Sequence, residues 1–150
     1  MMEFSIRPAT PADTLALAAL EDEARTALVH ARGGRRLLAE QPPVDDWASV
    51  VEDPAAAVWV AMIGEVTVGY LQLRLPAPGG TGEVVQVYVQ PGARELGFGD
   101  DLVAAAITAT KAAGGVEIDS FALPGDRNTK NLYERAGITA RKIIVSKRLV

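Results

Sequence analysis

A strand, a glycine-rich turn and a helix follow one another near the middle of the chain. The strand is the apolar run Val84–Val89, the turn is Arg94–Gly99, and a helical pattern runs from Asp100 to about Ala113. Glycines let a backbone approach a ligand closely, and the unpaired N–H groups of a helix N-terminus favour phosphate oxygens. The pattern therefore predicts a site for a phosphate-bearing ligand.

Two common phosphate-binding architectures fit this turn poorly. A nucleotide-triphosphate loop requires Gly-Lys-Ser/Thr, whereas Asp100 and Asp101 follow the second glycine here. A dinucleotide-binding fingerprint requires a third glycine where this chain has Leu102. Asp119 lies twenty residues after Gly99, about where that fingerprint has the acidic residue that binds the ribose. However, only about fifty residues follow the turn, too few for the strand–helix units that the fold needs.

The turn and three further segments resemble the GNAT (Gcn5-related N-acetyltransferase) superfamily. Arg94–Gly99 matches the Gln/Arg-x-x-Gly-x-Gly/Ala pyrophosphate loop of that family, and Val87–Val89 followed by Pro91 leads into it. Leu132–Ile138 is similar to the family's Tyr-Glu-x-x-Gly-Phe segment, with Ile in place of Phe. The opening Ile6–Asp13 resembles its first strand and turn, so the resemblance covers nearly the whole chain.

The resemblance implies a mixed α/β fold formed as a single domain over residues 1–150. Its central, mostly antiparallel sheet would have six or seven strands, flanked by about four helices. Apolar periodicity and turn residues agree with that order. We expect strands near Phe4–Pro8, Val58–Ile63, Val66–Leu75, Glu83–Gln90, Val116–Leu123 and Ile143–Leu149, and helices near Asp13–Val29, Asp46–Val51, Asp100–Ala113 and Arg127–Ala136, with a helical turn at Arg36–Glu40.

The family also implies the ligand, which would be acetyl-coenzyme A acting as cosubstrate. Its pantetheine arm would pair with the backbone of the strand at Val87, Tyr88 and Val89. Its pyrophosphate would be held by the turn and the first residue of the helix, namely Arg94, Glu95, Leu96, Gly97, Phe98, Gly99 and Asp100.

Carboxylates depart from the family pattern at two places near this ligand. Asp100 and Asp101 suit a helix N-terminus, but they would repel a pyrophosphate if they pointed toward it. Asp126 stands where the family usually has Asn, and it can cap the next helix but lacks the amide donor. Asn128 or Asn131 would then supply the contact with the coenzyme.

Acetyl transfer to an amine needs a base, an oxyanion donor and an acid for the leaving thiolate. Glu83, at the start of the central strand, lies where several GNAT enzymes carry a catalytic glutamate, so we expect it to be the general base. A backbone N–H near Val87–Val89 would be the oxyanion donor. Tyr133 matches the family tyrosine that protonates the leaving sulfur.

These residues lead to one preferred function and one alternative. The preferred function is an N-acetyltransferase that transfers the acetyl group directly, in a ternary complex, to a primary amine of a small molecule or peptide. A chain without cysteine is consistent with direct transfer. The alternative is a non-catalytic acyl-coenzyme A binding or regulatory module, suggested by the carboxylates at Asp100, Asp101 and Asp126.

Composition narrows the class of partner and location. A net charge of −4 gives no general attraction to nucleic acid, and no apolar run approaches the length of a membrane span. The chain has no cysteine and one histidine, His30, which does not support a metal site. No secretion signal is visible, and we expect a cytoplasmic protein. The apolar strand expected at Ile143–Leu149 would lie at a sheet edge, which predicts a homodimer through that strand.

Overall fold

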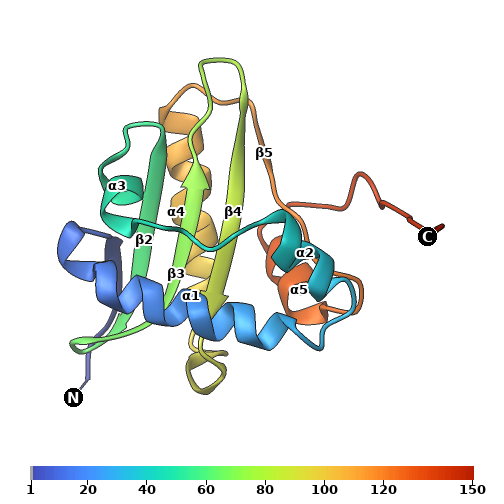
Figure 1. Cartoon of the computed structure of the whole chain (residues 1–150). Coiled ribbons are helices and arrows are strands. Elements are labelled where there is room, and N and C mark those ends of the chain that lie inside the picture. The colour runs from blue at the N-terminus through green and yellow to red at the C-terminus, as the bar shows by residue number, and fades with distance from the viewer. Residues whose placement is uncertain (1) are drawn as a thin grey trace.

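One sheet forms the centre of the computed structural model, which describes residues 2–150 (Figure 1). Its five strands lie in the order of the chain: β1 (Phe4–Pro8), β2 (Ala56–Ile63), β3 (Val66–Arg74), β4 (Thr81–Val89) and β5 (Glu117–Asp119). The first four strands pair antiparallel, and β4 pairs with β5 in parallel. The mostly antiparallel mixed sheet is therefore as expected.

Helices cover both faces of this sheet. In Figure 1, α1 (Thr14–Leu28) crosses the front and α4 (Phe98–Ala112) lies behind. The other helices are α2 (Gly34–Glu40), α3 (Trp47–Glu52) and α5 (Arg127–Arg135), and 3₁₀ turns occupy Pro11–Asp13 and Pro91–Ala93. None of the helices within residues 2–150 is both long and apolar enough to cross a membrane.

Alternating side chains along the strands create two apolar cores, one on each face. On one face, valines of β2 pack against Leu17 and Leu20 of α1 and against Trp47 of α3. On the opposite face, strand residues such as Leu71 and Val84 pack against α4. Because successive side chains of a strand point to opposite faces, both cores hold the same sheet in place. The strands that border the functional site are therefore fixed from both sides.

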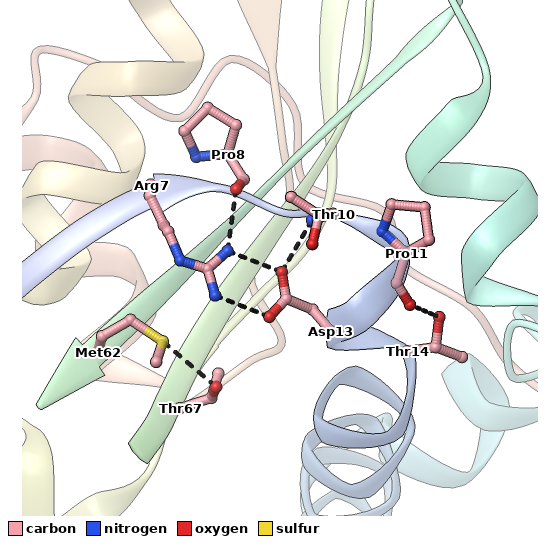
Figure 2. A network of polar contacts seen from close by, with 8 residues as sticks. All are labelled: Arg7, Pro8, Thr10, Pro11, Asp13, Thr14, Met62 and Thr67. Carbon is pink, nitrogen blue, oxygen red and sulfur yellow. Dashed lines mark hydrogen bonds and ion pairs between the residues drawn. The ribbon is translucent and has the colours of Figure 1, made fainter. Parts of the chain in front are cut away.

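A partly buried ion pair ties β1 to the start of α1 (Figure 2). Both terminal nitrogens of Arg7 lie 2.8 Å from the carboxylate oxygens of Asp13, and the backbone N–H of Thr10 donates to Asp13 Oδ2 at 2.8 Å. The side chain of Asp13 is 8% exposed. The hydrogen bonds from Arg7 are the main cause that lowers the pKa of Asp13. This contact sets the position from which α1 crosses the sheet.

The sheet divides between β4 and β5. The two strands pair only at Thr81–Glu117, Gly82–Ile118 and Glu83–Asp119. Beyond that point β4 continues to Val89, while β5 ends at Asp119. On its other side β4 pairs with β3, and the register shifts there because Val84 and Gln86 oppose consecutive β3 residues, which makes Val85 the bulged residue. The edge of β4 from Val84 to Val89 consequently has no strand partner within residues 2–150.

Two expectations about strands and one about helices were wrong. Residues 143–149 form no strand, and the tail leaves the sheet (Figure 1). Its apolar side chains Ile143, Ile144, Val145 and Leu149 are exposed. The strand expected over Val116–Leu123 is present but confined to Glu117–Asp119. Without a strand at 143–149, the sheet within residues 2–150 has five strands, not six or seven. The segment at 34–40, expected as a loop with one helical turn, is α2, and it makes five α-helices within residues 2–150, not four. Strand propensity alone cannot create a strand where no neighbouring strand pairs with it.

Replacing Asp13 by Asn should lower the free energy of unfolding at pH 7 by about 1–2 kcal/mol, because the charged bonds from Arg7 are lost. The folded pKa of Asp13 is depressed. Its stabilising contribution is therefore complete above the unfolded value of about 4, and it is lost as pH falls through the folded value.

The measurement is urea unfolding between pH 2 and pH 7, with the exposed Asp22→Asn as the matched control. Asp13→Asn should flatten the acid part of the stability curve, and Asp22→Asn should not. Equal acid slopes for Asp13→Asn and wild type would contradict this assignment of Asp13.

Candidate functional site

Beyond the pair Glu83–Asp119 the strands β4 and β5 separate, and we call this point the fork. The fork opens into a cleft of about 1220 Å³. One wall comes from α1 and α2, the floor from β4, and the other wall from the turn before α4, the segment after β5 and the start of α5. The α1–α2 wall is mixed: Leu28, Leu37 and Leu38 are apolar, and polar or charged residues also line it, namely Arg25, Arg32 and Gln41. A ligand in this cleft would therefore lie along the unpaired edge of β4 and reach the N-terminus of α4.

The glycine turn places a free helix N-terminus in this cleft. Gly97 is the N-cap of α4, with φ +88°, and no side chain caps the helix there. Glu95 also has a positive φ of 70°, a strained conformation for a residue with a side chain. The N–H groups of the first turn, at Phe98, Gly99 and Asp100, therefore lack the intrahelical acceptors of later residues. This arrangement can bind an anion.

Gly99 has a packing role besides its place in the turn. A Cβ at this position would lie 3.1 Å from Leu132 Cδ1 of α5, which is tighter than most Cβ contacts in proteins. A glycine here lets α5 approach the start of α4, whereas Gly97 is needed because its φ is positive. The two glycines of the motif thus serve different purposes, which the sequence pattern did not distinguish.

The structure gathers nearly all of the expected binding residues around this cleft. Those that line it are Val87, Tyr88, Val89, Arg94, Glu95, Gly97, Phe98, Gly99, Asp100, Asp126, Asn128 and Asn131. Leu96 is not among its lining residues, and its side chain is exposed. Phe98, the first residue of α4, has its side chain buried in the core, so only its backbone is available to a ligand.

Two of the three carboxylates that depart from the family pattern, Asp100 and Asp126, are hydrogen-bonded within the protein, and Asp101 does not line the cleft. Arg135 of α5 donates its Nε–H to Asp100 Oδ1 at 2.9 Å. Asp126 caps α5 by accepting the backbone N–H of Thr129 at 3.1 Å and its hydroxyl at 2.7 Å, as its position predicted. The negative charge of Asp100 is thus balanced by a cation that lines the same cleft.

Arg94 lies against the end of β4. Its Nε–H donates to the carbonyl oxygen of Val89 at 3.0 Å, and its guanidinium carbon lies 6.0 Å from the centre of the Tyr88 ring. Burial is the main cause that raises the pKa of Tyr88, followed by the charge of Glu23. The terminal nitrogens of Arg94 carry positive charge beside the uncapped helix N-terminus, which strengthens the site for an anion.

Tyr133 lies at the inner end of the cleft beside Ser120. The two hydroxyl oxygens are 2.6 Å apart, and Ser120 Oγ also lies 3.4 Å from the carbonyl oxygen of Val84. Tyr133 is 7% exposed. Burial is the main cause that raises the pKa of Tyr133, and the charge of Asp126 raises it further, whereas the bond from Ser120 lowers it. Ser120 is the first residue after β5, so the fork positions it.

Glu83 lines a second, smaller cleft of about 230 Å³. Its carboxylate accepts a hydrogen bond from Arg74, its register partner on β3. This cleft shares four residues with the large one: Gln41, Val85, Ser120 and Phe121. The two expected catalytic residues therefore line adjoining clefts, and Ser120 belongs to both. A ligand in one cleft can meet a ligand in the other where the strands separate.

Sequence reasoning missed several residues that shape the site. Ser120 and Arg135 act through partners 13 and 35 residues away, so no local pattern marks them. A buried network was also missed: Tyr70 donates to Gln86 at 2.6 Å, and Gln86 donates to Glu21 at 2.9 Å. This network holds β4 to α1 beneath the cleft. Within residues 2–150, no group of three or more metal-binding side chains comes together.

Comparison with known proteins gives a family and a fold. The chain matches the family model described as "Acetyltransferase (GNAT) family" over residues 15–138. No match is found among curated protein sequences.

Three solved structures illustrate the likeness in fold. The aminoglycoside N-acetyltransferase AAC(6')-Iy, solved in complex with CoA, is 19% identical, with a TM-score of 0.71 and coverage of 99% of this chain and 97% of that one. A ribosomal-protein-alanine N-acetyltransferase from Brucella melitensis biovar Abortus 2308 is 20% identical, with a TM-score of 0.66 and 98% coverage of both. A transcriptional regulator from Bacillus halodurans C-125 is 22% identical, with a TM-score of 0.72 and coverage of 98% and 100%.

Two charge changes should move the affinity for coenzyme A in opposite directions. Asp100→Asn removes a negative charge from the mouth of the anion site, so the affinity should rise about two- to fivefold. Arg135→Gln leaves Asp100 unbalanced, so the affinity should fall by a similar factor.

Isothermal titration calorimetry with coenzyme A at low salt measures both effects, and added salt should reduce them. Lys111→Gln, at the opposite end of α4, serves as the control and should leave the affinity unchanged. The same direction of change for both variants would refute this view of the site.

Proposed function

The chain belongs to the GNAT acetyltransferase family, and from this premise we propose that it is an N-acetyltransferase acting as a single domain. It transfers an acetyl group from acetyl-coenzyme A directly to a primary amine of a small molecule or peptide. The observation that carries the proposal is the fork of the sheet, which aligns a free strand edge, an uncapped helix N-terminus and Tyr133 along one cleft.

Coenzyme A fits the chemistry of this cleft. Its pyrophosphate needs N–H donors and positive charge, which the first turn of α4 and Arg94 supply. Hydrogen bonds of this charge-assisted kind contribute about 1.5–3 kcal/mol each. Its pantetheine arm carries amide groups, which suit the edge of β4 from Val84 to Val89. Asn128 and Asn131 line the same cleft and offer amide donors.

The expected roles of Glu83 and Tyr133 are compatible with their positions. The amine enters through the small cleft, where Glu83 accepts its proton directly or through water. Tyr133, in the large cleft, donates a proton to the departing sulfur. A backbone N–H of β4 near Val87–Val89 is the proposed donor to the oxyanion. Val85 and Ser120, which line both clefts, lie where the two substrates meet.

The alternative function, a non-catalytic acyl-coenzyme A binding module, has lost much of its support. It was based on the carboxylates at Asp100, Asp101 and Asp126. Arg135 balances the charge of Asp100, and Asp126 is engaged as a helix cap. Tyr133 and Glu83, the proposed acid and base, line adjoining clefts, which favours an enzyme.

Turnover with a panel of primary amines tests the enzyme against the binding module. Wild type should release coenzyme A thiol from acetyl-coenzyme A with at least one amine. Tyr133→Phe should lower kcat about 10²-fold or more, because the acid is removed while the ring still fills its site. Glu83→Gln should lower kcat/KM for the amine, most strongly near neutral pH.

Thiol release is followed continuously with a thiol reagent. Tyr88→Phe, which loses only a 3.3 Å contact with Glu23, is the matched control and should retain more activity than Tyr133→Phe. Tight coenzyme A binding without turnover of any amine would favour the binding module instead.

We further propose a homodimer formed through the tail. The outer edge of β5 has no strand partner within residues 2–150, and the tail beside it exposes Ile143, Ile144, Val145 and Leu149. Arg141 anchors the start of the tail to β5, with its Nη2 at 2.7 Å from Asp119 Oδ2. An unpaired edge and an apolar strand-forming segment can pair between two copies.

Multi-angle light scattering should therefore give twice the mass of one chain, and Ile144→Lys should give the mass of one. Ser146→Lys, a charge change on a polar position of the same segment, should weaken association less. A monomeric wild-type chain at high concentration would refute the dimer.

A further inference from the structure

Ser120 occupies a position that the proposed chemistry has not yet used. It is the first residue after β5, it is half-buried, and it lines both clefts. Its hydroxyl oxygen lies 2.6 Å from Tyr133 Oη and 3.4 Å from the carbonyl oxygen of Val84. Within residues 2–150, no other side chain hydrogen-bonds to the Tyr133 hydroxyl.

A serine hydroxyl has one proton and here faces two acceptors. When Ser120 donates to the Val84 carbonyl, its oxygen can accept the phenolic proton of Tyr133. When Ser120 donates to Tyr133, the phenolic proton is free to point into the cleft. Rotation about one C–O bond exchanges the two states, so the change needs no movement of the backbone.

We propose that Ser120 is a positioning residue that directs the phenolic proton of Tyr133 to the leaving sulfur and then stabilises the phenolate. This inference rests on the proposed acetyl transfer. As the carbon–sulfur bond breaks, its electron pair stays on sulfur, and the Tyr133 proton moves to that sulfur to give the thiol. The Ser120 hydroxyl then donates to the phenolate oxygen.

The amine releases as many protons as the thiol takes up. Counted from the free amine, the attacking nitrogen loses one proton when the amide forms, and the sulfur gains one when the thiol forms. The amine proton reaches solvent through Glu83, and water returns a proton to Tyr133, so the reaction consumes none overall. Ser120 keeps its own proton throughout and changes only its hydrogen-bond acceptor.

The surroundings of Tyr133 explain why such a partner is needed. A phenolate is costly at a buried site, and burial and the charge of Asp126 both raise the pKa of Tyr133, against the effect of Ser120. Three other carboxylates near the fork are each paired with an arginine: Asp100 with Arg135, Glu83 with Arg74 and Asp119 with Arg141. In the described part of the chain, residues 2–150, no lysine or arginine hydrogen-bonds to the phenol, which leaves its stabilisation to Ser120.

Steady-state rates of Ser120→Ala across pH test the proposal. We expect kcat to fall about tenfold, in keeping with the loss of one hydrogen bond to a charged oxygen. The alkaline limb of kcat should move to higher pH, because Tyr133 loses the contact that favours its ionised form. Ser120→Thr, which keeps the hydroxyl, should restore both the rate and the pH profile. The KM for acetyl-coenzyme A should change by less than about twofold.

Two comparisons separate this role from a structural one. In the background of Tyr133→Phe, the change Ser120→Ala should cost little further activity, since the two residues act as a unit. Ser5→Ala on β1, far from both clefts, is the matched control and should change neither rate nor pH profile.

An alkaline limb unmoved by Ser120→Ala, or a full tenfold loss repeated in the Tyr133→Phe background, would overturn the role of Ser120. In either case a wild-type enzyme that turns over would leave the proposed function intact. Absence of turnover with every amine would overturn both.

Discussion

The brief pairing of β4 with β5 is the constraint on which the rest of this site depends. After three residue pairs the strands separate, because β5 ends at Asp119 while β4 continues to Val89. A longer parallel pairing would cover the edge of β4 and leave no cleft. The fork also determines where Ser120 lies, since this residue is the first one beyond the paired region. The bulge at Val85 coincides with the same point on the other edge of β4.

The elements around the fork are held from outside the cleft, which leaves its lining groups free to act. Two apolar cores fix the sheet, and the Arg7–Asp13 pair sets the course of α1 on one side. On the other side, Gly99 allows α5 to pack closely against α4, and Arg135 joins the two helices at Asp100. Asp100 and Asp126, two of the three carboxylates that suggested a non-catalytic module, are thereby engaged in the scaffold.

Local patterns in the sequence predicted most of the fold and the cleft, but not the contacts that complete it. The strands expected at Val58–Ile63 and Val66–Leu75 are present as β2 and β3, and Asp126 caps α5 as expected, because strand patterns and caps depend on neighbouring residues. The tail at Ile143–Leu149 has strand-forming residues, yet a strand also needs a partner, which its sequence does not specify. Ser120 and Arg135 likewise depend on residues that only the tertiary fold brings near.

The central claim is that the forked edge of β4 and the N-terminus of α4 together bind coenzyme A. Amide chemical-shift mapping by ¹⁵N NMR during a titration with coenzyme A tests it most directly. The account predicts saturable shifts concentrated at Val87–Val89, at Gly97–Asp100 and around Asn128 and Tyr133, with β1 and β2 little affected. No saturable shifts, or shifts centred away from the fork, would contradict it.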